Sequence, residues 1–205
     1  MTKPLLLSNP EEFYISTSDI QTRVAEIGEE LAERFDGQEV TLLTVLRGAK
    51  PFAQDLKREM QHSIFNAKIV SDSIRVKSYE GTESTGDLRF LKKPETDLHG
   101  KNILVAEDIL DTGQTLSLLV RWLHSEYSPA SLTVVTMLEK PGSRLPSTDI
   151  DAEVITGLRI ADKFVVGYGL DYNEEYRELP FITICEQQPD GLWTPKIPDG
   201  FALAA

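Results

Sequence analysis

Apolar residues recur along the chain at two spacings, one that favours helices and one that favours buried strands. The helical spacing is clear over residues 20–35, where the apolar positions are Ile20, Val24, Ile27, Leu31 and Phe35. Ser18 and Gln21 form a capping-box pattern near the start of this segment, and Gly37 follows its end. Side chains three and four positions apart share one face of a helix, so the segment is predicted to be an amphipathic helix.

Continuous apolar runs rich in β-branched residues predict the strands of a buried sheet. The predicted strands are residues 40–46, 69–79, 102–106, 132–138, 163–170 and 181–186. Helical segments follow the first and the third of these strands. Alternating strands and helices favour an α/β fold with a parallel sheet and helices on both faces. The Pro- and Gly-rich segment 187–205 indicates a loosely ordered tail.

Three acidic residues, Glu107, Asp108 and Asp111, follow the predicted strand 102–106 and precede a turn of small residues. In an open α/β sheet, ligands bind outside the carboxyl ends of the strands. The backbone N–H groups of residues 112–115, at the start of the next helix, are suited to bind an anion such as phosphate. The alternative interpretation is a solvated acidic turn in which Asp111 merely helps to cap the helix.

Composition narrows the range of partners. The chain has 205 residues and a net charge of −12, which argues against binding to nucleic acid or to anionic membranes. No apolar run approaches the length of a membrane span, and the start of the chain does not resemble a signal peptide. Cys185 is the single cysteine, so no intrachain disulfide is possible. These features predict a cytoplasmic protein.

The segment "LVAEDILDTGQTL" resembles the phosphoribosyl-diphosphate signature of the type I phosphoribosyltransferases. Three further segments, "VLRGAKPFAQDL", "RVKSYEGTESTGDLRF" and "DKFVVGYGLDYNEEYRELPFI", are similar to the hypoxanthine–guanine members of that family. The resemblance implies the type I phosphoribosyltransferase fold, a mainly parallel twisted sheet flanked by helices with a small hood. It implies one domain over residues 1–186, with a core at about 37–160. The hood would be built from the N-terminal segment and about 161–186, which leaves 187–205 as a tail of unknown role.

The resemblance assigns the sugar phosphate to the acidic turn. It implies that Glu107 and Asp108 bind the ribose hydroxyls. It assigns the 5-phosphate to the turn formed by Thr112, Gly113, Gln114 and Thr115. It also implies that Asp111 accepts the proton of the imidazole-ring nitrogen as this nitrogen attacks the sugar.

The resemblance assigns four residues to the binding of the purine base. Lys140 would donate a hydrogen bond to the 6-oxo oxygen, which excludes adenine because its amino group offers no acceptor there. Phe164 would stack on the base, and Val165 would contact its edge through the backbone. Asp171 would lie near the base as a carboxylate linked to the metal. Without the resemblance, Lys140 is a surface lysine at a strand end, and Phe164 and Val165 are ordinary core residues.

The resemblance assigns five residues to the binding of the diphosphate: Arg47, Gly48, Arg177, Ser78 and Tyr79. In the family, a non-proline cis peptide occurs at the position of Arg47-Gly48. Ser78 and Tyr79 would begin a loop that closes over the reacting atoms and excludes water. The implied cofactor is Mg²⁺, associated with Asp171, Glu107 and Asp108.

The implied activity is purine salvage. The 5-phosphoribosyl group passes from phosphoribosyl diphosphate to hypoxanthine or guanine, which gives IMP or GMP and diphosphate. A xanthine-preferring enzyme is one alternative, and a nucleotide-sensing, RNA-binding regulator with the same fold is another. The regulator requires a basic face, and the acidic chain shows no basic cluster to form one. The partners expected are small-molecule substrates, with no nucleic acid and no membrane, and assembly as a homodimer or homotetramer.

Overall fold

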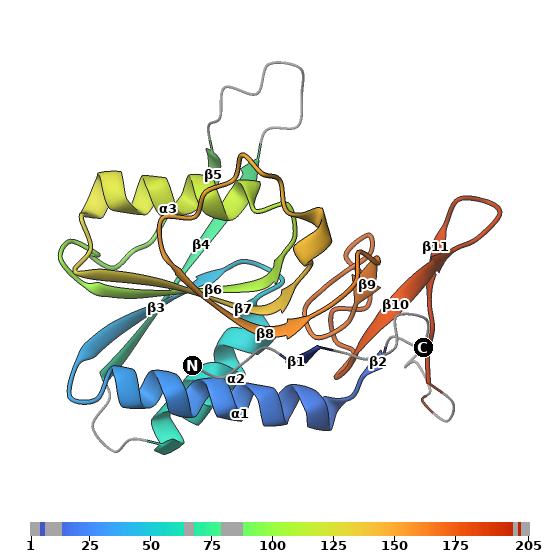
Figure 1. Cartoon of the computed structure of the whole chain (residues 1–205), viewed down its shortest axis with the longest axis horizontal. Coiled ribbons are helices and arrows are strands. Elements are labelled where there is room, and N and C mark those ends of the chain that lie inside the picture. Colours follow the sequence, from blue (N-terminus) through green and yellow to red (C-terminus); the bar gives the residue numbers. More distant parts are fainter. Residues whose placement is uncertain (1–4, 7–13, 64–67, 79–87, 199–200, 202–205) are drawn as a thin grey trace.

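The centre of the protein is a seven-stranded sheet in the order β1-β8-β7-β6-β3-β4-β5 (Figure 1). The computed structural model describes residues 5–6, 14–63, 68–78, 88–198 and 201. The strands are β1 (Leu5–Leu6), β3 (Glu39–Val45), β4 (Lys68–Ser78), β5 (Leu88–Lys92), β6 (Asn102–Leu110), β7 (Ser131–Glu139) and β8 (Glu153–Arg159). All neighbouring pairs are parallel except β4 with β5. The predicted mainly parallel sheet is therefore confirmed.

Helices cover both faces of this sheet, as the alternating pattern predicts. Helices α1 (Thr17–Arg34) and α2 (Lys50–Ser63) lie on one face, and α3 (Gln114–Tyr127) lies on the other (Figure 1). Two separate apolar clusters fill the space between the sheet and the two helical layers. None of the helices that the structure describes is long and apolar enough to cross a membrane.

The start of α1 differs from the predicted cap. The N-cap residue is Ser16, whose hydroxyl accepts a hydrogen bond from the Asp19 N–H at 3.1 Å. The Asp19 carboxylate in turn accepts from the Ser16 N–H at 3.2 Å. The prediction of Ser18 and Gln21 is therefore wrong by two residues, because an aspartate at the third helical position completes the same reciprocal pattern as a glutamate or glutamine.

A second, smaller sheet packs beside the first. Strand β10 (Ile182–Gln187) pairs antiparallel with β2 (Tyr14–Ile15), with β9 (Val165–Val166) and with β11 (Trp193–Pro195). Segments from near both ends of the chain therefore meet in one sheet, to the right of the main sheet in Figure 1. Through β11, part of the segment 187–205 is an ordered strand, so the prediction of a loosely ordered tail is wrong for residues 193–195.

One strand was missed from the sequence, and one predicted strand differs in length and place. The parallel strand β8 was not predicted, because Gly157 interrupts a short apolar run. The predicted strand 163–170 shortens to the two residues of β9 and belongs to the second sheet. Gly167 and Gly169 both have φ of 100°, a conformation that residues with side chains rarely adopt, and so the chain turns away after Val166.

Candidate active site

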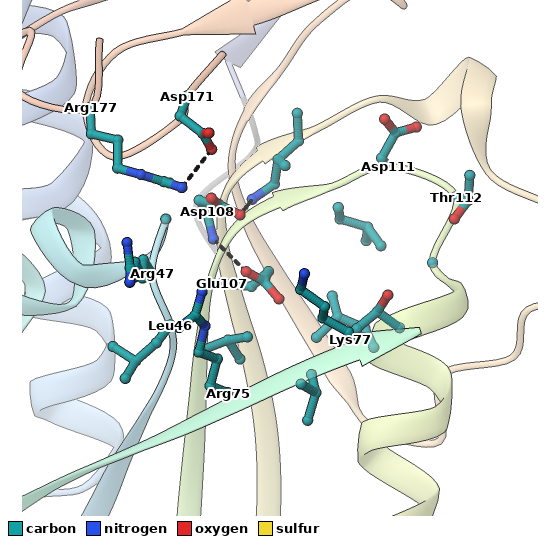
Figure 2. A pocket seen from close by; sticks show the side chains of 18 of the residues that line it. Leu46, Arg47, Arg75, Lys77, Glu107, Asp108, Asp111, Thr112, Asp171 and Arg177 are labelled. Carbon is teal, nitrogen blue, oxygen red and sulfur yellow. Dashed lines mark hydrogen bonds and ion pairs between the residues drawn. The ribbon is translucent and has the colours of Figure 1, made fainter. Parts of the chain in front are cut away.

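A cavity of 440 Å³ opens at the carboxyl ends of β3, β4 and β6 and at the start of α3 (Figure 2). Many residues predicted from the sequence line it. They are Arg47, Gly48, Glu107, Asp108, Asp111, Thr112, Gly113, Thr115, Asp171 and Arg177. The location agrees with the rule that ligands bind outside the carboxyl ends of parallel strands.

Glu107 and Asp108 lie inside β6, not in the turn after it, because this strand continues to Leu110. The Asp108 N–H donates to Glu107 Oε1 at 3.1 Å, and the Ile109 N–H donates to Asp108 Oδ1 at 2.8 Å. Burial raises the pKa of the Glu107 carboxyl well above its usual range, and the neighbouring Asp108 charge adds to this effect. Burial also raises the pKa of Asp108. The pair therefore favours binding of a proton, a hydroxyl donor or a cation.

Removing one charge of this pair should stabilise the protein. A carboxyl with a raised pKa keeps its proton in the folded state over a pH range where the unfolded chain releases it. Stability is consequently lost as the pH rises above the unfolded pKa of about 4.3. We expect Glu107→Gln to raise Tm at pH 8 on the order of 2–4 °C, the shift that about 1 kcal/mol gives in a chain of this size. Thermal melts without added ligand at pH 5 and pH 8 measure the change.

The matched control is Glu29→Gln, which changes an exposed carboxylate on α1. The gain from Glu107→Gln should be smaller at pH 5 than at pH 8, whereas the control should be insensitive to pH. An equal Tm for wild type and Glu107→Gln at pH 8 would contradict the raised pKa.

Arg177 occupies the side of the cavity formed by the segment after β9. Its guanidinium donates to the Gly169 carbonyl at 2.7 Å and contacts the carboxylates of Asp171 at 2.8 Å and Glu174 at 3.2 Å. Glu174 also accepts from Arg47 at 2.9 Å. Figure 2 shows Asp171 and Arg177 across the cavity from β4. Two arginines distant in sequence are thus held at one cavity by one shared carboxylate, that of Glu174.

Gly48 is confined between two parts of the site. A Cβ atom at this position would lie 1.6 Å from Asp108 Oδ2, and a Cβ at Gly169 would lie 1.9 Å from the Gly48 carbonyl oxygen. Only a glycine at residue 48 leaves room for the Asp108 carboxylate. The cis peptide joins Leu46 to Arg47, not Arg47 to Gly48. The implied position is thus wrong by one residue, since the bond precedes Arg47 where the chain leaves β3.

The first turn of α3 borders the cavity, and its Gln114 N–H donates to the Thr112 side-chain oxygen at 3.4 Å. The first N–H groups of a helix have no partner within the helix, and the first α-helical bond here runs from the Ser117 N–H to the Gly113 carbonyl, at 2.9 Å. Thr112 is braced from outside the cavity, because its carbonyl accepts from the Leu145 N–H at 3.2 Å and from the Thr148 hydroxyl at 3.0 Å. Gln114 is the one residue of the predicted phosphate turn that does not line the cavity.

Lys140 lies just outside the cavity and is buried. Its ammonium contacts the carboxylate of Asp111 at 3.2 Å and that of Asp162 at 3.4 Å. Asp162 lines a second cavity of 950 Å³ together with Phe164. Lys140 therefore joins the first cavity, which Asp111 lines, to the neighbourhood of Phe164. Val165 is buried in β9 and lines neither of these two cavities.

Sequence reasoning missed two basic residues, Arg75 and Lys77. Both line the cavity, and Figure 2 shows their side chains rising from β4 on the side of Glu107. They are two positions apart in β4, on either side of a shift in its pairing with β5 between Arg75 and Val76. Their alternation in "IRVKS" is the signal that could have identified them. Ser78 follows at the end of β4, whereas Tyr79 and the rest of the implied loop to residue 87 lie outside the described residues.

Residues 16–173 match the model of the phosphoribosyl transferase domain family. This match includes every cavity residue named above except Glu174 and Arg177, and it extends over most of the chain. The chain belongs to the phosphoribosyltransferase family.

Individual members of this family are similar to this chain over most of their length. The hypoxanthine phosphoribosyltransferase of Salmonella typhimurium is 39% identical over 176 residues, which cover 83% of this chain and 93% of the relative. The hypoxanthine-guanine phosphoribosyltransferase of Bacillus subtilis is 39% identical over 175 residues, which cover 85% of this chain and 92% of the relative. A crystal structure of a Staphylococcus aureus hypoxanthine phosphoribosyltransferase is 36% identical, with a TM-score of 0.74 over 83% of this chain and 88% of that one.

These relatives confirm the resemblance to the phosphoribosyltransferases and the type I phosphoribosyltransferase fold. The phosphoribosyltransferase match ends at residue 173, before β10 and β11. The second sheet is thus completed by residues that the family model does not include.

Proposed function

We propose that the protein is a purine-salvage enzyme that transfers the 5-phosphoribosyl group from phosphoribosyl diphosphate to hypoxanthine or guanine. The products are IMP or GMP and diphosphate. The observation that carries the proposal is the contact between Asp111 and Lys140, 3.2 Å apart, beside the start of α3. A proton acceptor and a donor for a 6-oxo group thus stand together next to a site suited to a phosphate. The curated relatives named for hypoxanthine and guanine support this choice of bases.

The sugar phosphate binds at the end of β6 and the start of α3. The 5-phosphate accepts hydrogen bonds from the backbone N–H groups of residues 112–115 and benefits from the positive end of the helix dipole. Glu107 and Asp108 accept hydrogen bonds from the ribose hydroxyls. Their raised pKa values support this role, because a hydroxyl donor relieves the repulsion between the two carboxyls without adding a charge.

The diphosphate binds among the basic side chains of the cavity. Arg47 and Arg177 come from the turn after β3 and from the segment before β10, and Arg75 and Lys77 come from β4. The backbone at Gly48 lets the anion approach closely, and Ser78 lies at the end of the same strand as Lys77. When diphosphate binds, Arg177 exchanges its carboxylate partners for diphosphate oxygens. One set of charge-assisted hydrogen bonds is then replaced by another.

The donor set fits a magnesium ion that arrives with the substrate. Among the described residues, no group of three His, Cys, Asp or Glu side chains is placed to hold a metal by itself. Mg²⁺ commonly uses one or two carboxylates together with substrate phosphates and water, and Asp171, Glu107 and Asp108 can supply the carboxylates. When bound, the ion would compensate the negative charge that gathers on the departing diphosphate.

The reaction joins a ring nitrogen of the base to the anomeric carbon of the sugar. Lys140 donates to the 6-oxo oxygen, Phe164 stacks on the ring, Val165 contacts its edge through the backbone and Asp171 lies nearby. As the N–C bond forms, the bond from that carbon to the diphosphate oxygen breaks, and the diphosphate leaves with the electron pair. Asp111 accepts the proton of the attacking nitrogen, so the product is the neutral nucleotide base. We infer a cytoplasmic enzyme that assembles as a homodimer or homotetramer.

Turnover with hypoxanthine, guanine, xanthine and adenine tests this proposal. We expect wild type to use the first two bases and to reject adenine. Lys140→Met should lower kcat/KM for hypoxanthine by roughly 10–100-fold, the value of a hydrogen bond from a charged donor. The change should lie mainly in the KM of the base, since Lys140 does not line the cavity proposed for the diphosphate sugar.

A matched control is Lys93→Met, because the ammonium of Lys93 lies over the rings of Phe90 and Trp122, near α3 and away from the cavity. The control should retain wild-type kcat/KM for hypoxanthine. Dominant use of adenine by wild type would refute the role of Lys140.

A further inference from the structure

The residues after the family match bring a tryptophan to the proposed base site. Strand β11 pairs with β10, with Trp193 opposite Gln187 and Pro195 opposite Cys185. The Lys196 N–H donates to the Ile184 carbonyl at 2.9 Å, and the Lys196 carbonyl accepts from the Thr183 hydroxyl at 2.6 Å. Figure 1 shows β11 lying along β10. These bonds fix the place of Trp193 in the second sheet.

Trp193 contacts the ring of Phe164, the residue proposed to stack on the purine. The ring centroids of Phe164 and Trp193 are 5.0 Å apart, with 45° between the ring planes. Tyr172 meets Phe164 edge-on, at 5.9 Å and 85°. The Phe164 carbonyl accepts from the Cys185 N–H at 2.8 Å, which holds the backbone. Two aromatic neighbours therefore limit the rotation of the Phe164 ring, which remains only half-buried.

Trp193 also shares a cavity with the residues around the base-recognition lysine. Phe164, Asp162 and Trp193 line the same 950 Å³ cavity, and Asp162 contacts Lys140 at 3.4 Å. The indole thus lines the cavity whose Asp162 contacts Lys140.

We infer that Trp193 is a positioning residue for the purine base. It holds the Phe164 ring in the plane on which the base stacks, with the 6-oxo oxygen directed to Lys140. The inference rests on the proposed function and extends it to a segment outside the family match. The recognised ligand is the planar 6-oxopurine ring, in the base and in the nucleotide product.

A purely structural role for Trp193 leads to different expectations. Trp193 packs against the small apolar cluster of Val166, Leu179, Phe181 and Cys185, so its removal also weakens the second sheet. Loss of packing alone lowers Tm and the fraction of active enzyme, and leaves the KM values of the remaining active enzyme unchanged. Loss of ring positioning raises the KM of the base and spares that of the diphosphate sugar.

The experiment compares Trp193→Ala and Trp193→Phe with wild type in the full chain. We expect Trp193→Ala to raise the KM for hypoxanthine and guanine about three- to tenfold, the effect of losing an aromatic pair. The KM for phosphoribosyl diphosphate should stay within about twofold of wild type. Trp193→Phe keeps an aromatic ring beside Phe164 and should return the base KM toward wild type. The matched control is Leu192→Ala, which removes an exposed side chain from the neighbouring residue.

Three outcomes would overturn the inference. They are an unchanged base KM in Trp193→Ala, an equal rise of both KM values, or no recovery in Trp193→Phe. Failure of the proposed function is distinguishable, because then wild type itself would turn over none of the 6-oxopurine bases, and the inference would fall with it. Normal turnover in wild type with an unchanged base KM in Trp193→Ala refutes the inference alone.

Discussion

Asp111→Asn should lower the turnover number by about 10²–10⁴-fold, the usual contribution of a positioned proton acceptor. An asparagine oxygen can still accept the hydrogen bond from Lys140, which in wild type is 3.2 Å from the carboxylate. The shape of the site is therefore kept while its proton acceptor is removed. Initial rates with saturating hypoxanthine and phosphoribosyl diphosphate measure the loss.

The same variant should bind phosphoribosyl diphosphate with nearly wild-type affinity, as titration calorimetry would show, because we propose that backbone donors at the start of α3 hold the phosphate. Asp36→Asn, at an exposed position after α1, is the control and should retain full turnover. Turnover of Asp111→Asn equal to wild type would remove Asp111 from its role as the proton acceptor.

Gly48→Ala should also inactivate the enzyme, with turnover reduced on the order of 10²-fold, because displacing a site group by about 1 Å can cost that much. The added methyl carbon would lie 1.6 Å from Asp108 Oδ2 and 2.7 Å from Asp108 Cγ, so the carboxylate must move. We expect a weaker affinity for phosphoribosyl diphosphate as well, since we propose that this carboxylate binds the sugar and that the diphosphate lies beside Gly48. Steady-state kinetics and calorimetry measure the two effects.

Gly142→Ala provides the matched control, because a Cβ at residue 142 meets no atom within 4 Å. Both variants replace a glycine by alanine near the ends of strands, so only the contact with Asp108 distinguishes them. A Gly48→Ala enzyme with wild-type kinetics would show that Asp108 can be displaced without consequence.

Local patterns predicted most of the main sheet, because a buried parallel strand reads as an apolar run in the sequence. The run 40–46 corresponds to β3 and the run 132–138 to β7, each within one residue at either end. The run 102–106 gives only the first half of β6, since Glu107 and Asp108 look like the start of a turn. The pattern of apolar residues therefore cannot distinguish the polar end of a strand from the start of a loop.

The sequence predicted the part of the candidate site whose residues are contiguous. It did not predict the contacts between residues that are distant in the sequence. Residues 107–115 form one motif, so their type and spacing could be interpreted directly. The fit of Gly48 against Asp108 depends on the separation of β3 and β6 in the sheet, which no local pattern encodes. The same holds for Trp193, which contacts Phe164 only because β11 pairs with β10.

The pairing of β10 has a consequence for the order in which the chain can fold during synthesis. The parallel strands from β3 to β8 are all present once residue 159 has been made. The second sheet needs a strand from near the start of the chain, β2, and a strand made late, β11. In a nascent chain, the strands that carry Glu107, Asp108 and Arg75 can therefore pair with their neighbours before the second sheet beside Phe164 is complete, which requires residues up to Pro195.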